Sequence, residues 1–170
     1  METKPATPAA KGALIALVLI LLALTIYFAG QIGNRNLRYI QYAVVFVGIL
    51  LSSVYYAKQM DGNVTFGNIF AEGFKTTAVV IVLLSLYTII SMKLIFPEMI
   101  VKILDAGRQE AQAQGKESID EFEKNYATMK DFMVPITIGF TILSIGITGA
   151  VASTIGAALA RKKPNNSFAQ

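Results

Sequence analysis

Residues 132–160 read FMVPITIGFTILSIGITGAVASTIGAALA, 29 residues without a charged side chain, and Arg161-Lys162-Lys163 follows directly. At about 1.5 Å of rise per residue, a helix of this length measures about 43 Å, which exceeds the roughly 30 Å hydrocarbon core of a bilayer. Tilting, or a first turn in the interface around Pro135, accommodates the excess. Proline suits a first helical position, where its missing N–H costs nothing. The stretch therefore predicts a transmembrane helix.

Three more uncharged blocks precede this one, at residues 12–29, 39–57 and 76–92. Each approaches the roughly 20 residues that a transmembrane helix needs. A cleaved signal peptide is the alternative for the first block, but its apolar stretch is long, and Tyr27 and Phe28 disfavour cleavage near Gly30. We predict one polytopic domain over residues 1–170, with spans at about 12–30, 38–58, 74–96 and 134–160.

The polar segment 98–131 separates the last two spans. Apolar residues recur at helical spacing in both of its halves, and residues 109–116, which contain Gly115, divide them. Ser118 and Glu121 have the spacing of a capping box, which marks the start of the second helix. The sequence thus predicts an all-α membrane protein of four transmembrane helices, with an amphipathic helical hairpin between the third and the fourth.

Composition excludes most site chemistry. The chain has no cysteine and no histidine, which removes thiolate nucleophiles, the commonest general base and the commonest metal ligand. Asp120, Glu121 and Glu123 form an acidic cluster, but a solvated helix face explains it better than a calcium loop. The net charge of +4 comes from basic residues beside the spans, not from a nucleic-acid-binding stripe. We therefore expect no catalytic residues, no cofactor, no metal and no nucleic-acid partner.

Basic residues near the spans predict the orientation. Four spans place both termini on one side, where seven Lys and Arg residues compare with eight on the other side. The cluster Arg161, Lys162 and Lys163 breaks this tie because it adjoins a span, whereas the basic residues of the hairpin are dispersed. We predict a multi-pass protein of the bacterial inner membrane, with cytoplasmic termini and the hairpin outside.

Small residues form a stripe along the fourth span. Its members are Gly139, Gly146, Gly149, Ser153, Gly156 and Ala160, and Gly48 and Ser52 on the second span are candidates for the facing groove. Small residues let membrane helices approach closely. The stripe is a candidate assembly interface with a partner or a second copy. Packing within the four-helix bundle is the more ordinary interpretation.

A short motif precedes the third span. Asp61-Gly62 predicts a turn, and Thr65 is a candidate cap for the helix that follows. Phe66, Phe70 and Phe74 recur at helical spacing, which predicts an amphipathic lead-in lying at the membrane interface. Glu72 and Lys75 have the i, i+3 spacing of a local ion pair.

The segment Asp61–Gly67 (DGNVTFG), followed by Phe70, Gly73 and Phe74, resembles a bacterial four-helix membrane family of unknown function. That family is typical of Gram-negative anaerobes and gliding-type bacteria. The resemblance implies inner-membrane residence and supplies no catalytic residues. Because such proteins are thought of alongside envelope glycosyltransferases, it also suggests an enzyme of that class as a partner.

Two functions fit these observations. The first is a non-enzymatic accessory or assembly subunit in the lipid bilayer, acting through its helix faces and its hairpin on a membrane-protein partner or a second copy. The alternative is a small transporter or channel that works as an oligomer. A polar seam along the bundle axis favours the alternative, and a dry apolar centre disfavours it.

Overall fold

The computed structural model describes residues 6–32 and 34–160, which are helical apart from short connections and contain no strand. Its elements are α1 (Pro8–Phe28), α2 (Arg35–Gln59), α3 (Phe66–Ile90), the π-helix η1 (Ser91–Ile95), α4 (Met99–Gln114) and α5 (Lys116–Ala160). Four helices are long and apolar enough to cross a membrane: Pro8–Phe28, Asn36–Gln59, Phe66–Ile95 and Ile119–Ala160. The fold class expected from the sequence is therefore confirmed. The basic cluster Arg161, Lys162 and Lys163 lies outside the described residues.

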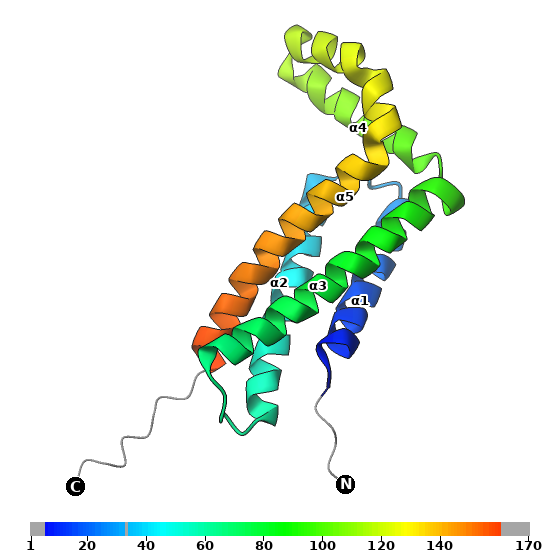
Figure 1. Ribbon diagram of the computed structural model, residues 1–170. Helices are drawn as coiled ribbons and strands as arrows, with labels where there is room; N and C mark the ends of the chain where they lie inside the picture. The colour runs from blue at the N-terminus through cyan, green and yellow to red at the C-terminus, as the bar shows by residue number, and fades with distance from the viewer. Residues whose placement is uncertain (1–5, 33, 161–170) are drawn as a thin grey trace, which may run out of the picture.

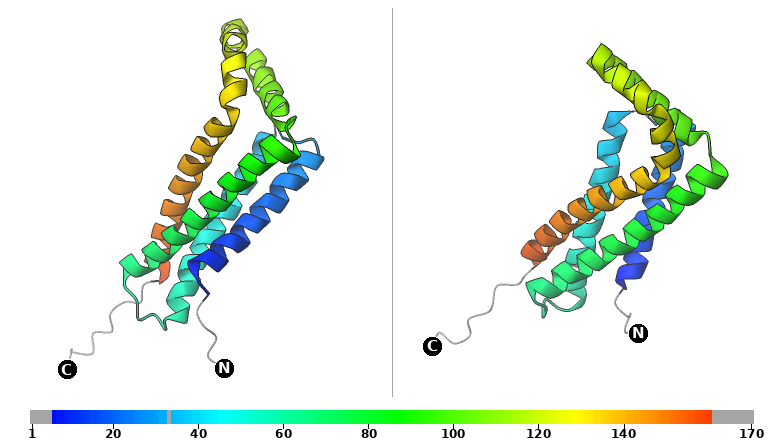
Figure 2. Two further views of the ribbon diagram at one scale, coloured as in Figure 1. Left: turned by 45° about the vertical axis from the view of Figure 1, so that its right-hand side comes forward. Right: turned by 45° about the horizontal axis from the view of Figure 1, so that its top comes forward.

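The four long helices form a bundle from which a hairpin projects (Figures 1 and 2). α3 packs against α1, α2 and α5. The start of α1 and the end of α5 lie at one end of the bundle, which we call the terminal end. At the opposite end, the hairpin end, α4 and the first part of α5 extend beyond the other helices. An even number of spans accounts for this arrangement.

α5 differs from its predicted form. It is one continuous helix of 45 residues, about 67 Å long, which serves first as an arm of the hairpin and then as the fourth span. Pro135 therefore lies inside the helix and not at a first helical position. Figure 1 shows α5 changing direction where the hairpin meets the bundle. A proline inside a helix removes one backbone hydrogen bond and favours such a bend.

Local chemistry sets the ends of the other helices. Thr65 caps α3, because its hydroxyl accepts a hydrogen bond of 3.2 Å from the backbone N–H of Asn68. Asp61 and Gly62 form the preceding turn with φ angles of 50° and 73°. At the far end of this span the N–H of Phe96 donates to the carbonyl of Ser91 (2.7 Å), closing the wide turn of η1 before Pro97. The side chain of Ser118 lies outside the described part of the chain.

The bundle interior has distinct layers. Its middle is an apolar cluster, whose buried members are Leu19, Val45, Ile49, Val80, Ile145 and Ala152. A layer of buried hydroxyl groups follows toward the terminal end, made by Ser52, Ser53, Thr76, Thr77 and Ser153. A second apolar cluster of Ala57, Ile69 and Ala157 lies beyond it. Large apolar side chains such as Leu17, Leu21 and Leu143 point outward, as expected for helices in contact with lipid.

The amphipathic lead-in expected before the third span is the beginning of the same helix. Residues 66–74 are the first turns of α3 itself, and Ile69 and Gly73 are buried in the bundle. Phe66 and Phe74 are exposed, and the ring of Phe74 stacks on that of Phe70 at 5.8 Å between centroids. The side that packs against the other helices is therefore the one with Ile69 and Gly73, and not the one with the exposed rings of Phe66 and Phe74.

Candidate functional site

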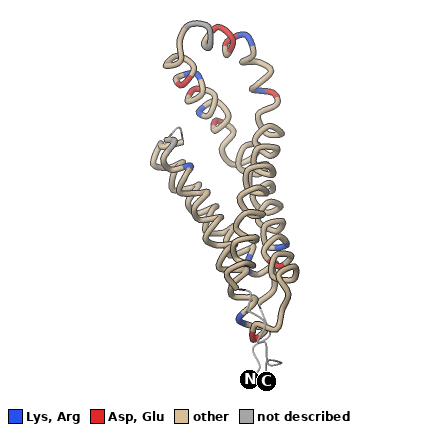
Figure 3. The backbone as a smooth tube through the Cα atoms, turned by 90° about the vertical axis from the view of Figure 1, so that its left-hand side faces the viewer, with Lys and Arg blue, Asp and Glu red and all other residues tan. Residues whose placement is uncertain are grey.

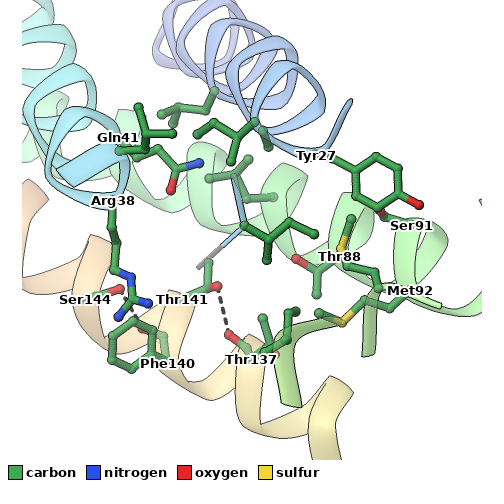
Figure 4. Close-up of a pocket in the computed structure, with 18 of the residues that line it drawn as sticks. Tyr27, Arg38, Gln41, Thr88, Ser91, Met92, Thr137, Phe140, Thr141 and Ser144 are labelled. Carbon is green, nitrogen blue, oxygen red and sulfur yellow. Dashed lines mark hydrogen bonds between the residues drawn. The ribbon is translucent and has the colours of Figure 1, made fainter. Parts of the chain in front are cut away.

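A cleft opens at the hairpin end of the bundle. It has a volume of about 600 Å³ and receives residues from all five α-helices and from η1. Figure 4 shows its interior, with α2 and α5 facing each other across it. The apolar cluster in the middle of the bundle forms the floor, since Leu19, Val45 and Ile145 belong to both. The cleft therefore ends at mid-bundle.

The cleft is amphipathic. Apolar side chains such as Leu84 and Met133 make up most of its wall, and the guanidinium of Arg38 lies at its open edge. In Figure 4 the Arg38 side chain reaches from α2 toward Ser144 and Phe140 on α5. The amide of Gln41, one turn further along α2, also points into the cleft. The wall thus offers apolar surface deep inside and polar donors near the edge.

Hydroxyl groups of α5 face this cleft with their oxygens available as acceptors. Thr137 donates to the carbonyl of Met133 at 2.8 Å, Thr141 to that of Thr137 at 2.8 Å, and Ser144 to that of Phe140 at 2.6 Å. Such bonds within the helix satisfy the hydroxyl hydrogens. The three residues therefore add mild polarity to the wall without forming a hydrophilic channel.

An aromatic and charged cluster ties α1 to the start of the hairpin. The hydroxyl of Tyr27 donates to the carboxylate of Glu98, and the ammonium of Lys102 donates to the Tyr27 oxygen at 3.3 Å. Lys102 also lies 4.4 Å from the centroid of the Tyr27 ring, which packs on Phe96 at 4.3 Å. The hydrogen bond from Tyr27 lowers the pKa of Glu98 below its ordinary value of 4.5. Glu98 is therefore ionised at neutral pH and anchors the hairpin to α1.

The hairpin is held together by its own contacts. Leu104 is buried, and Gly107 of α4 lies against the ring of Phe122 in α5. The guanidinium of Arg108 pairs with the carboxylate of Glu123 at 2.5 Å. Both charged side chains are about half exposed, so the pair adds little stability and mainly aligns the two arms. Figure 3 shows charged residues along this hairpin and a second group toward the terminal end of the bundle.

The small-residue stripe of α5 divides into an internal and an open part. A Cβ atom on Gly149 would lie 2.3 Å from Thr77 of α3, and one on Gly156 would lie 2.7 Å from the Cβ of Ser53 in α2. Ser153 is fully buried beside Gly73. Toward the hairpin end, Gly146 has only a distant neighbour. A Cβ atom on Gly139 would meet nothing within 4 Å.

The two candidates on α2 lie apart from this stripe. Gly48 faces Ile15 of α1, whose Cγ1 atom would lie 3.0 Å from a Cβ at this position. The hydroxyl of Ser52 hydrogen bonds to that of Thr76 in α3 at 3.1 Å. Ser53, the next residue, is the one that meets Gly156. The residue of α2 that faces the stripe is therefore Ser53 and not the expected Ser52. One residue on a helix corresponds to about 100° of rotation.

A buried ion pair at the terminal end is not apparent from the sequence. The ammonium of Lys11 in α1 donates to the carboxylate of Glu72 in α3 at 2.8 Å, and each side chain is only 10% exposed. The rings of Tyr55 and Tyr56 in α2 lie 5.8 and 5.5 Å from the ammonium. The expected local pair of Glu72 with Lys75 does not form, since Lys75 is exposed. The sequence does offer one signal for this pair, because Lys11 and Glu72 carry opposite charges and adjoin spans on the same side of the membrane.

No metal-binding cluster occurs among the described residues. The search of curated proteins and the search of solved structures both give no match. A family model, described as "Protein of unknown function (DUF4199)", matches residues 11–162. This range includes the first spanning helix from its fourth residue onward, the other three spanning helices and the whole hairpin. The chain therefore belongs to this family of proteins of unknown function.

Proposed function

We propose that the chain is a non-enzymatic accessory or assembly subunit of a membrane complex, which holds its partner through the projecting hairpin. The observation that carries this proposal is the hairpin itself, which extends beyond the bundle and is stabilised by its own seam (Figure 1). Its exposed side chains include Asp105, Gln109, Glu121 and Lys124. A rigid arm with mixed charges suits a specific polar interface with another protein.

The attachment of the hairpin supports the same role. Tyr27, Glu98 and Lys102 fix its base to α1, and continuous helix connects its second arm to the fourth span. A partner that binds the hairpin is therefore connected to the bundle without a flexible linker. The partner is a membrane protein, for which the resemblance suggests an envelope glycosyltransferase, or a second copy of this chain.

The alternative function is a small transporter or channel that acts as an oligomer. The cleft open at the hairpin end is what favours it. Against it stands the apolar cluster at mid-bundle, which separates the cleft from the buried hydroxyl layer in the part of the chain that the structure describes. A polar solute passing from the cleft to the hydroxyl layer would have to cross this apolar cluster without hydrogen-bond partners. We therefore prefer the accessory role.

Photo-crosslinking in intact membranes tests the accessory role. A photoreactive residue at Gln109 or Lys124 on the hairpin is expected to give a discrete adduct, because both side chains are exposed there. The same residue at Leu14, which is 64% exposed on the bundle, is the control and is expected to react with lipid only. An adduct of twice the chain mass identifies a second copy as the partner. Equal lipid-only labelling at all three positions, with a monomer in mild detergent, would contradict the proposal.

We further propose that the protein resides in a bacterial inner membrane, with the terminal end in the cytoplasm and the hairpin outside. Single cysteines at Asn34, Asn63 and Gln114 test this in a chain that has no natural cysteine. An impermeant thiol reagent applied to spheroplasts is expected to label Asn34→Cys and Gln114→Cys, which lie at the hairpin end, but not Asn63→Cys. Labelling of Asn63→Cys alone would invert the topology and move the partner search to the cytoplasm.

A further inference from the structure

We propose that the cleft binds one phospholipid, with its phosphate at Arg38 and an acyl chain along the apolar wall between α2 and α5. α4 forms part of this cleft, but the site uses none of the exposed hairpin side chains that are proposed above to meet a partner. The proposal rests on three features of the cleft, which are its place in the bundle, its size and the position of Arg38.

The place of the cleft favours a lipid. The residues that line it on α2, α3 and α5 belong largely to the helices that can cross a membrane, so much of the cleft lies within the part of the bundle that the bilayer would surround. The floor is apolar, and Leu19, Val45 and Ile145 close it. Lipid is the solvent at this depth, and an acyl chain satisfies such a surface whereas water does not. The apolar inner part of the cleft therefore suits a lipid tail.

The size of the cleft excludes a larger occupant. Its volume of about 600 Å³ lies within the roughly 300–1,000 Å³ range of small-molecule sites. A transmembrane helix of a partner, about 10 Å across with its side chains, takes up roughly 400 Å³ per turn, so this volume holds little more than one turn of it. An acyl chain is narrow enough to follow the wall from the edge to the floor.

The polar edge of the cleft supplies the headgroup contacts. Arg38 lies in the first turn of α2, where the positive end of the helix dipole adds to its charge. Among the described residues Arg38 has no ion-pair partner. Glu110 on the α4 side of the cleft takes part in an interaction of its own. A phosphate at Arg38 completes the arginine's hydrogen bonding, and the amide of Gln41 lies within the cleft to meet a more deeply placed ester oxygen.

Native mass spectrometry of the full chain in mild detergent tests the site. Phosphatidylglycerol is added in steps, and we expect one adduct that saturates at a single lipid per chain. Arg38→Gln is expected to weaken this adduct at least tenfold. Lys93→Gln is the matched control, because Lys93 is exposed at the same end of the bundle but does not line the cleft. It removes one positive charge and is expected to leave the adduct unchanged.

Two further binding measurements distinguish the contribution of the lipid headgroup from that of the acyl chains. Diacylglycerol with the same acyl chains lacks the phosphate and is expected to bind as weakly as phosphatidylglycerol does to Arg38→Gln. Inorganic phosphate alone is not expected to compete, since it offers nothing to the apolar wall. Thr141→Phe places a ring in the cleft and is expected to abolish the adduct, with circular dichroism confirming that the variant remains folded. Equal binding to Arg38→Gln and Lys93→Gln, or a broad series of adducts without a saturating first one, would overturn the proposal.

Discussion

Replacing Gly149 by isoleucine is expected to destabilise the bundle by about 3 kcal/mol, whereas the same replacement at Gly139 changes its stability by less than about 1 kcal/mol. Both glycines lie in α5, so helix propensity contributes equally to the two variants. The difference is the space around them. A Cβ atom on Gly149 would lie 2.3 Å from the Cγ2 and Oγ1 atoms of Thr77, and one on Gly139 would meet nothing within 4 Å.

Thr77 cannot easily make room for the new side chain. It is 1% exposed, and its hydroxyl donates to the carbonyl of Gly73 at 2.9 Å. Rotating it away would break this bond inside the bundle, so α3 and α5 must separate instead. Unfolding in mixed detergent micelles, followed by circular dichroism, measures both variants. Equal stability of Gly149→Ile and Gly139→Ile would show that the two helices do not approach as closely as described.

Removing the ammonium group of Lys11 is expected to cost about 3 kcal/mol of stability. In Lys11→Met the carboxylate of Glu72 stays at the same place, with its side chain only 10% exposed and without the cation 2.8 Å away. A buried charge without its partner is strongly unfavourable. Lys75→Met is the control, because Lys75 is exposed on the same helix as Glu72.

A double variant separates the ion pair from the space that it fills. Lys11→Met combined with Glu72→Leu removes both charges, and we expect it to recover most of the stability lost in Lys11→Met alone. The same unfolding assay in detergent applies. If the double variant is less stable than Lys11→Met, the apolar replacements pack poorly and the pair is not the dominant interaction at this place. A loss in Lys75→Met equal to that in Lys11→Met would contradict the prediction outright.

The number and order of the membrane helices follow from the sequence because charges are too costly in a bilayer to interrupt a span. The hairpin follows from the return of charges after Glu98 together with apolar residues at helical spacing. Continuity of α5 does not follow. Pro135 predicts a helix start as readily as a bend inside a helix, and only the backbone hydrogen bonds on either side decide between them.

A single sequence does not predict which helix each residue of the bundle contacts. The stripe of α5 marks a face that admits another backbone, but its spacing does not say which helix comes there. Gly149 meets α3, Gly156 meets α2, and Gly139 meets no neighbour within 4 Å. The pairing of Lys11 with Glu72 joins residues that are 61 positions apart. Neighbours at such separation depend on how the bundle closes, whereas Glu72 and Lys75 are adjacent on any helix.

The π-helix at the end of the third span determines the direction in which the chain leaves the bundle. Successive residues of an α-helix are rotated by about 100°, and a turn closed from Ser91 to Phe96 contains one residue more than the ordinary turn. The chain after Ile95 is therefore rotated about the axis of the third span by about a quarter-turn or more, compared with an unbroken α-helix. The direction in which the chain enters the hairpin is thus set by a count of residues. Loss of a single residue within Ser91–Ile95 is expected to rotate the start of α4 away from Tyr27, while α5 holds the second arm in place.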